Sequence, residues 1–540
     1  MIVESPSHLN YPEVPAGATL AGSAVRWPDR VALRAGGTEL TFAELYRRAC
    51  AFAHALRAEG VGVGDVVAVH LGNRPEYAVA YHGILLSGAT YTPVNPLLPP
   101  ADLAAQLADS GAVLAVSFAP ANRALEAVRE QTAVRRVVLA GDASFEDFVA
   151  RRPTTRPEVT IDVHRDIAHL AYTGGTTGRS KGVRLPHRNV VVNTLQFACW
   201  RAGAAPRLDA DGGLWIEQVG DPADYPERLG TDVGINLTPW FHAMGTVGSL
   251  NVAVLSGTTQ VLHHRFDPAA YLADAERYGV TGMAGAPPLF AALVGHPDFA
   301  TRDLHTVRGI TSGAAPLAVE MINALVARFG PKVIIGEGYG LTEVTMGATA
   351  GPAARSAVRK VGTVGLPVAD TRIKVVAEES DEPLPPGEAG EVCISGPQVM
   401  LGYRNRPDET AAVLAGGWLR TGDIGVLDED GYLSIVDRKK DMLLYKGYNV
   451  YPRQLEERLF GQPGITGAAV VGRPDPAVGE LPVAFVVAPG FDEADGEKLR
   501  AAVNADLLPY QHIRELRLVE EIPVSAAGKV LKRELRELLA

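Results

Sequence analysis

Hydrophobic residues recur at helical spacing and in short β-branched runs that alternate along the first part of the chain. In residues 42–59, for example, Leu45, Ala49, Phe52 and Leu56 fall on one face of a helix. Because strands separated by helices of this length pair side by side, the pattern predicts a parallel sheet with helices on its faces. The predicted helices are residues 42–59, 75–86, 102–108 and 123–131, and the predicted strands are residues 66–71, 90–94, 112–117 and 136–140.

Later regions interrupt or repeat this alternation. Residues 203–234 are rich in Gly, Asp and Pro, and we expect a long surface excursion or a lid there. The alternation returns over residues 281–338, and residues 361–434 have the short, turn-rich strands of a small β subdomain. A charged run at residues 437–441 precedes a last segment with its own pattern, with helices at 452–460 and 495–507 and strands at 467–471, 483–487 and 516–519.

The predicted fold class is therefore α/β with two domains. Residues 1–439 are expected to form a large N-terminal domain of α/β sheets with the small β subdomain. Residues 440–540 are expected to form a small α+β C-terminal domain.

Composition narrows the class of protein. Of the 540 residues 47% are hydrophobic, which excludes disorder, and the net charge of −11 argues against a nucleic-acid binder. Cys50, Cys199 and Cys393 lack metal-ligand or CxxC spacing, as expected in a reducing compartment. Residues 1–17 show no leader pattern and no apolar stretch is long enough to span a membrane, so a cytoplasmic enzyme without a membrane span is expected.

The segment Tyr172-Thr-Gly-Gly-Thr-Thr-Gly-Arg-Ser-Lys-Gly182 follows an apolar run and has the composition of an anion-binding loop. Its glycines let backbone N–H groups surround an anion, its threonine hydroxyls add donors, and Lys181 adds a positive charge. The spacing is not that of a Walker loop, in which Ser or Thr follows Gly-Lys. The segment therefore predicts a phosphate-binding loop of another class.

Six further segments follow this loop along the chain. They are residues 237–245 (LTPWFHAMG), 311–316 (TSGAAP), 336–343 (GEGYGLTE), 418–423 (WLRTGD), 437–447 (DRKKDMLLYKG) and 523–529 (PVSAAGK). Together they resemble the adenylate-forming superfamily, which includes acyl-CoA synthetases, peptide-synthetase adenylation domains and firefly luciferase. The resemblance covers nearly the whole chain and is greatest to a bacterial fatty-acyl-CoA ligase.

The resemblance implies a two-step reaction. A carboxylate attacks the α-phosphate of ATP to give an acyl-adenylate and pyrophosphate, and the thiol of coenzyme A then displaces AMP. Bringing two anions together requires cations and donors directed at the developing charge, which accounts for the residue types of the motifs. ATP, Mg²⁺ and coenzyme A are the cofactors implied.

At the nucleotide site the resemblance implies roles for individual residues. Thr342 would donate to the α-phosphate, and Glu343 with Thr176 would hold Mg²⁺. Asp423 would accept hydrogen bonds from both ribose hydroxyls, and Tyr339 would stack on the adenine. Arg438 would help at the ribose. The other implied ATP- and AMP-binding residues are Thr173, Gly174, Gly175, Thr177, Gly178, Lys181, Gly313, Ala314, Ala315, Gly338 and Gly340.

The resemblance also implies how the acyl group and coenzyme A are handled. Lys529 would bridge the carboxylate and the α-phosphate, and His242 would lie beside the acyl carboxylate. Lys440 would be the hinge about which the mobile C-terminal domain rotates, which brings Lys446 and Gly447 in to complete a tunnel for the pantetheine arm. The residues implied to line the acyl pocket are Ala243, Met244, Gly245, Ser312 and Val344.

These uncharged pocket residues predict a hydrophobic carboxylic acid as substrate, with a fatty acid first and an aryl or polycyclic acid second. His242 stands where amino-acid-activating relatives have Asp, which argues against α-amino acids. Two alternatives stay open: an acyl-AMP ligase that loads a carrier protein or an amine acceptor, and a non-catalytic protein that binds acyl-adenylates or ATP. Members of the superfamily that load carrier proteins usually have an inserted segment that blocks rotation of the C-terminal domain. No such insertion is evident over residues 390–441, which argues against the carrier-protein ligase. The assembly state is also open, with a homodimer as one option.

Overall fold

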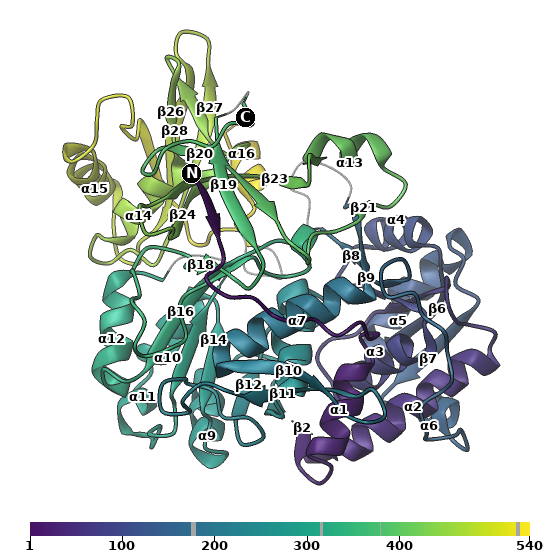
Figure 1. Cartoon of the computed structure of the whole chain (residues 1–540). Helices are drawn as coiled ribbons and strands as arrows, with labels where there is room; N and C mark the ends of the chain where they lie inside the picture. Colours follow the sequence, from purple (N-terminus) through teal and green to yellow (C-terminus); the bar gives the residue numbers. More distant parts are fainter. Residues whose placement is uncertain (174–179, 314–316, 378–379, 525–529, 540) are drawn as a thin grey trace.

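The computed structural model describes residues 1–173, 180–313, 317–377, 380–524 and 530–539. Two α/β units and a β subdomain form the large part of the molecule, and the C-terminal domain lies above them in Figure 1. This arrangement confirms the predicted α/β fold with a large N-terminal and a small C-terminal domain.

The first α/β unit is built on a seven-stranded sheet. Its strands lie in the order β21 (Gly402–Tyr403), β9 (Gly182–Pro186), β8 (Ile167–Tyr172), β5 (Thr90–Pro93), β4 (Val66–Val69), β6 (Ala112–Phe118) and β7 (Arg136–Ala140). From β8 to β7 neighbouring strands are parallel, as predicted, whereas β8, β9 and β21 pair antiparallel. The glycine-rich segment lies between β8 and β9 in the sequence.

Helices cover both faces of this sheet, as the alternation predicts (Figure 1). Thr41 caps the first of them through a reciprocal pair of hydrogen bonds with Glu44, so the helix begins where the sequence indicates. The predicted helix at 123–131 begins earlier because Pro120 favours a first turn. The helices of this unit are α2 (Phe42–Ala58), α3 (Pro75–Ser87), α4 (Pro100–Ser110), α5 (Ala119–Val128), α6 (Ala143–Val149) and α7 (His187–Ala202).

The second α/β unit is built on a nine-stranded sheet. Its strands lie in the order β18 (Leu366–Pro367), β17 (Thr349–Ala350), β16 (Ile334–Tyr339), β15 (Gly309–Ser312), β14 (Gly282–Gly285), β12 (Val233–Asn236), β13 (Thr259–Leu262), β2 (Val31–Ala35) and β3 (Thr38–Thr41). Strands β12 to β16 are parallel, so the residues at their carboxyl ends meet at one edge. The helices between these strands are α8 (Val252–Leu255), α9 (Pro268–Arg277), α10 (Pro287–Val294), α11 (Asp298–Thr301) and α12 (Val319–Phe329).

The β subdomain lies between these units and the C-terminal domain (Figure 1). Its antiparallel strands are β1 (Ile2–Glu4), β19 (Arg372–Val376), β20 (Ala389–Ser395), β22 (Leu414–Ala415), β23 (Trp418–Leu427) and β24 (Leu433–Arg438). Helix α13 (Pro407–Val413) precedes β22. Strand β24 leads directly into the C-terminal domain.

The C-terminal domain has a five-stranded sheet and a hydrophobic core of its own. The strands are β25 (Leu443–Tyr445), β26 (Tyr448–Val450), β27 (Gly467–Asp475), β28 (Gly479–Val487) and β29 (Glu515–Leu518), and the helices are α14 (Pro452–Phe460), α15 (Glu493–Ala505) and α16 (Lys532–Glu537). The core includes Leu443, Leu455, Val470 and Val503, all buried. The elements predicted in this region are present, and the β25–β26 hairpin and α16 are additional.

The excursion at residues 203–234 is more regular than its composition suggests. It contains a hairpin of β10 (Ala204–Leu208) and β11 (Leu214–Gln218), which packs against α1 (Ala18–Arg26). At Gly22 of that helix an added Cβ would lie 2.0 Å from the carbonyl oxygen of Leu214, so only glycine permits this approach.

The three cysteines are buried and free of disulfides. Burial raises the pKa of the Cys50 thiol to about 11, that of Cys199 to about 12 and that of Cys393 to about 11.

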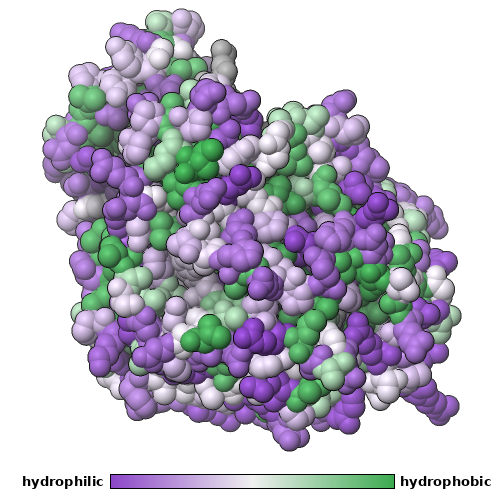
Figure 2. Space-filling model, viewed as in Figure 1, coloured by the Kyte–Doolittle hydropathy of each residue, from purple (hydrophilic) through white to green (hydrophobic). Residues whose placement is uncertain are grey.

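The face shown in Figure 2 intermixes hydrophilic and hydrophobic residues. Within the described ranges, every helix is too short or too polar to cross a membrane.

Candidate active site

The predicted ribose-binding residues Asp423 and Arg438 lie beside Tyr339, which is predicted to stack on the adenine. Tyr339 ends β16, and its hydroxyl donates to Asp423 Oδ2 at 2.6 Å. Asp423 and Arg438 are register partners on β23 and β24, with Arg438 Nε 3.7 Å from Asp423 Oδ1. Burial and the Asp423 carboxylate raise the pKa of Tyr339 well above its ordinary value, so the phenol stays protonated and keeps donating.

The glycines around Tyr339 are required by close backbone contacts. An added Cβ would lie 2.9 Å from the Thr349 carbonyl oxygen at Gly338 and 2.0 Å from the Met346 carbonyl oxygen at Gly340. These two glycines therefore let β16 and the following turn pack closely enough to present the Tyr339 ring.

Glu343 lies just after this turn, in the short helix η3 (Thr342–Val344). Its carboxylate Oε1 accepts a hydrogen bond from Tyr403 Oη at 2.8 Å, and its backbone oxygen accepts one from Met400 N at 2.8 Å. Tyr403 is in β21 and Met400 lies just before this strand, so residues 400–403 hold Glu343 in place. Among the described residues no cluster of three or more His, Cys, Asp or Glu side chains is placed to hold a metal ion.

Only the two ends of the phosphate loop lie in the described part of the chain. Thr173 N donates to the carbonyl oxygen of Lys181 at 3.1 Å, which closes the loop at its base. Lys181 Nζ pairs with Glu409 Oε2 of α13 at 2.5 Å and lies 4.8 Å from the centre of the Tyr403 ring. The predicted residues that lie outside the described ranges are Gly174, Gly175, Thr176, Thr177, Gly178, Ala314, Ala315 and Lys529.

The predicted acyl-pocket residues lie on η2, at the end of β15 and in η3. His242, Ala243, Met244 and Gly245 lie at the start of a π-helix, η2 (Met244–Asn251), a rare element that often occurs at functional sites. Met244 Cε comes within 2.9 Å of where a Cβ on Gly313 would be, so η2 touches the end of β15.

Two other predicted lining residues lie on other elements, at the end of β15 and in η3. Val344 is fully buried in the hydrophobic cluster under the β subdomain. Ser312, at the end of β15, is also buried.

The predicted hinge and tunnel residues lie at the start of the C-terminal domain. Lys440 follows β24, and burial together with the Arg438 guanidinium lowers its pKa. Lys446 and Gly447 form the turn of the β25–β26 hairpin, with positive φ angles of 52° and 81°. Beyond the chain neighbours, no atom lies within 4 Å of a Cβ added at Gly447, so that side of the turn faces open space, while Lys446 N donates to the carbonyl oxygen of Val478 at 2.7 Å.

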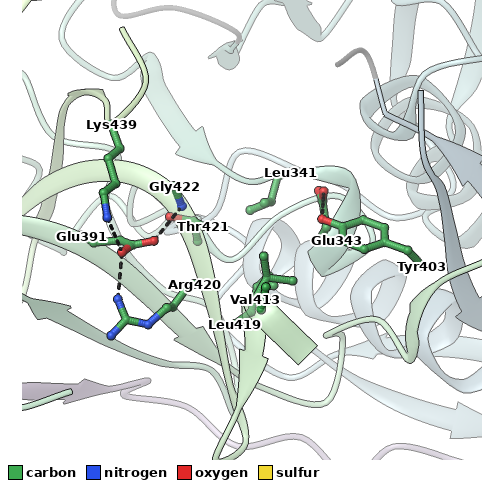
Figure 3. A pocket seen from close by; sticks show the side chains of 11 residues that line it. Leu341, Glu343, Glu391, Tyr403, Val413, Leu419, Arg420, Thr421, Gly422 and Lys439 are labelled. Carbon is green, nitrogen blue, oxygen red and sulfur yellow. Dashed lines mark hydrogen bonds and ion pairs between the residues drawn. The ribbon is translucent and has the colours of Figure 1, made fainter. Parts of the chain in front are cut away.

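A pocket of about 280 Å³ joins several of these groups (Figure 3). Glu343 and Tyr403 border one side of it, and Thr421, Gly422 and Lys439 border the other, with apolar side chains of Leu341, Val413 and Leu419 between them. Thr421 and Gly422 lie in β23, at the register shift against β20, and directly precede Asp423. The pocket therefore extends from the predicted metal-binding carboxylate to the residues next to the predicted ribose-binding Asp423.

The geometry adds three residues that the motifs did not indicate. They are Tyr403, which donates to Glu343; Glu409, which pairs with Lys181; and Glu391, which accepts from Gly422 N.

The chain belongs to the AMP-binding enzyme family. The family profile for the AMP-binding enzyme matches residues 20–404, and that for the AMP-binding enzyme C-terminal domain matches residues 454–529. The predicted membership of the adenylate-forming superfamily is thereby confirmed.

Several similar proteins align with nearly the whole chain. This chain is 33% identical to a long-chain-fatty-acid–CoA ligase of Bacillus subtilis (strain 168), over 98% of this chain and 96% of that one. It is 35% identical to a feruloyl-CoA synthase of Amycolatopsis sp, over 94% and 96%. Among solved structures, the anthranilate CoA ligase AuaEII in complex with anthranoyl-AMP superposes with a TM-score of 0.86 at 26% identity, over 98% of both chains.

Proposed function

We propose that the protein is an AMP-forming acyl-CoA synthetase for a hydrophobic carboxylic acid. The observation that carries this proposal is the pocket that has Glu343 on one side and Thr421 and Gly422, just before Asp423, on the other. A nucleoside triphosphate carries a ribose and a chain of metal-binding phosphates in one molecule, so one ligand could contact both sides.

The nucleotide is proposed to bind through residues already held in place. Tyr339 donates a hydrogen bond to Asp423 Oδ2 and so orients the carboxylate, which is proposed to accept the ribose hydroxyls. Thr342 donates to the α-phosphate. Lys181 exchanges Glu409 for the β- and γ-phosphates, because a triphosphate offers several charged acceptors in place of one carboxylate.

Glu343 is proposed to hold Mg²⁺ together with Thr176. A single described carboxylate fits this ion, because Mg²⁺ is usually bound through one or two carboxylates plus substrate phosphates. When bound, the ion supplies positive charge beside the reacting phosphate. The hydroxyl of Tyr403 keeps the carboxylate of Glu343 oriented for this role.

The two steps are proposed to use different parts of the C-terminal domain. In the first, Lys529 bridges the acid and the α-phosphate while the carboxylate oxygen bonds to phosphorus and pyrophosphate leaves. Rotation at Lys440 then brings in the Lys446–Gly447 turn. In the second step the sulfur of coenzyme A bonds to the acyl carbon, and the bond from that carbon to the AMP oxygen breaks.

The acid is proposed to be a fatty acid first and an aryl or polycyclic acid second. The pocket residues on η2 and β15 are uncharged, which favours an apolar acyl group. The named relatives include a long-chain-fatty-acid–CoA ligase and a feruloyl-CoA synthase, and so support both classes.

Transfer to a carrier protein or an amine is the second candidate, and binding of an acyl-adenylate or ATP without catalysis is the third. Mass spectrometry of reactions with ATP, Mg²⁺ and a panel of fatty and aryl acids, with and without coenzyme A, separates all three. We expect acyl-CoA from one chain-length or ring class. Acyl-AMP that accumulates regardless of coenzyme A would instead support the carrier-protein ligase, and no product would support the binding protein.

Gly447→Trp is expected to block thioester formation while leaving acyl-adenylate formation within about twofold of wild type, because the bulky ring fills the proposed tunnel. Gly447→Ala is the matched control, since it bears the same backbone strain at φ 81° without the bulk. The two half-reactions are followed by pyrophosphate exchange and by acyl-CoA release. Normal acyl-CoA output from the tryptophan variant would remove Gly447 from the tunnel.

A further inference from the structure

Glu391 of β20 is a nearly buried carboxylate that lies beside the predicted ribose site (Figure 3). Its side chain is 7% exposed. Oε1 accepts a hydrogen bond from Gly422 N at 3.2 Å, and Oε2 accepts one from Arg420 Nη1 at 2.8 Å. A buried carboxylate is costly unless it is paired, so these contacts must be present for the charge to be tolerated.

Lys439 closes this set of contacts into a ring. Its backbone N–H donates to the carbonyl oxygen of Gly422 at 2.9 Å, and its Nζ lies 3.7 Å from Glu391 Oε2. Gly422 is therefore held on both sides, by the Glu391 carboxylate at its N–H and by the Lys439 backbone at its carbonyl. Figure 3 shows the Lys439, Glu391 and Arg420 side chains converging at this point.

The ring surrounds a backbone conformation that departs from that of a regular strand. Gly422 has φ 73°, in the left-handed region, and open space where a Cβ would be. The glycine is thus required by the backbone conformation and not by crowding. This conformation sits within the register shift of β20 against β23, where regular ladder bonds are interrupted.

The two predicted ribose-binding residues are direct neighbours of this ring. Asp423 follows Gly422, and Arg438 precedes Lys439. A shift of either ring residue would therefore move the carboxylate or the guanidinium that is expected to meet the ribose.

We propose that Glu391 is a positioning residue of the nucleotide site, which acts with Lys439 as one unit to hold Asp423 and Arg438 for the ribose. This inference rests on the proposed function, because the ribose is the ligand that these two residues would meet. Glu391 itself does not need to touch the nucleotide. Arg420 supports Glu391 from the far side and is paired in turn with the exposed Asp381 at 2.8 Å.

The test measures AMP binding by calorimetry, because AMP carries the ribose and binding needs no reaction. Glu391→Gln keeps the shape but removes the charge, and we expect the Kd for AMP to rise about tenfold, the range for one hydrogen bond to a charged group. Lys439→Gln, at a half-exposed position, is expected to raise it about threefold. The double variant should match Glu391→Gln alone, because Lys439 acts through Glu391.

Steady-state kinetics separate a loss of nucleotide positioning from a general loss of enzyme activity. In Glu391→Gln the KM for ATP should rise with the Kd, while kcat at saturating ATP stays within about twofold of wild type. Glu497→Gln is the matched control, since Glu497 pairs with Arg500 on the exposed face of α15. Melting temperatures of all variants are recorded alongside.

Two results would overturn the proposal: a wild-type Kd in folded Glu391→Gln, or effects of the two variants that multiply in the double variant. If Glu391→Gln does not fold, an unchanged Kd in Lys439→Gln overturns it on its own. Failure of the proposed function looks different, because the wild-type protein would then bind no AMP, which removes both.

Discussion

Replacing Lys529 by alanine is expected to slow acyl-adenylate formation by about 10²–10³-fold, the scale on which one transition-state donor contributes. The proposed role explains the size, because Lys529 is the cation that meets both the acid and the α-phosphate as negative charge develops between them. Conversion of a supplied acyl-adenylate to acyl-CoA should be largely spared, since the proposed rotation at Lys440 would remove the lysine from the site before that step. Pyrophosphate exchange measures the first step, and acyl-CoA release from synthetic acyl-adenylate measures the second.

Lys498→Ala is the control for this variant. Lys498 also lies in the C-terminal domain, is 77% exposed and pairs with Asp495, so both half-reactions should remain at the wild-type rate. Equal losses of both steps in Lys529→Ala would show that the lysine does not belong to the first step in particular.

Glu343→Gln is expected to reduce acyl-adenylate formation by about 10²–10³-fold at ordinary magnesium concentrations, since the amide has the shape of the carboxylate without the charge that binds a divalent cation. Raising the magnesium concentration should recover part of the rate. The first half-reaction is measured over a magnesium titration, with AMP binding as a check that the nucleotide site is intact.

Tyr403→Phe provides the comparison for this variant. It keeps the Glu343 carboxylate and removes the hydroxyl that donates to it at 2.8 Å, so a loss of no more than about tenfold is expected. A Glu343→Gln enzyme with wild-type rate and magnesium dependence would contradict the metal-binding role.

Regular hydrophobic patterns made most of the large elements predictable. The helix expected at 42–59 is α2 (Phe42–Ala58), and the strand expected at 136–140 is β7 (Arg136–Ala140). The β25–β26 hairpin was not predictable, because strands of three residues hold too few positions for a period to show. The β10–β11 hairpin was hidden for another reason: its order depends on packing against Gly22 of α1, which is far away in the sequence.

Some site residues could likewise be predicted from the sequence, and others could be found only from the structure. Asp423 and Tyr339 stand in motifs whose residue types follow from the chemistry, and the fold brings them into contact. Tyr403 lies 60 residues from Glu343, and Glu391 lies 31 residues from Gly422, so neither could be recognised before the strands were paired. Their own segments look like ordinary strands and turns, because a positioning residue needs only its partner and no motif of its own.

The buried cysteines bear on a hazard of the proposed chemistry. An acyl-adenylate reacts with thiolates, so an exposed cysteine would become acylated and the enzyme would consume its own intermediate. At neutral pH the thiols of Cys50, Cys199 and Cys393, with pKa values of about 11, 12 and 11, are protonated almost completely, and all three are shielded by the core. The protein therefore presents the activated acyl group to an incoming thiol without offering these three as competing acceptors.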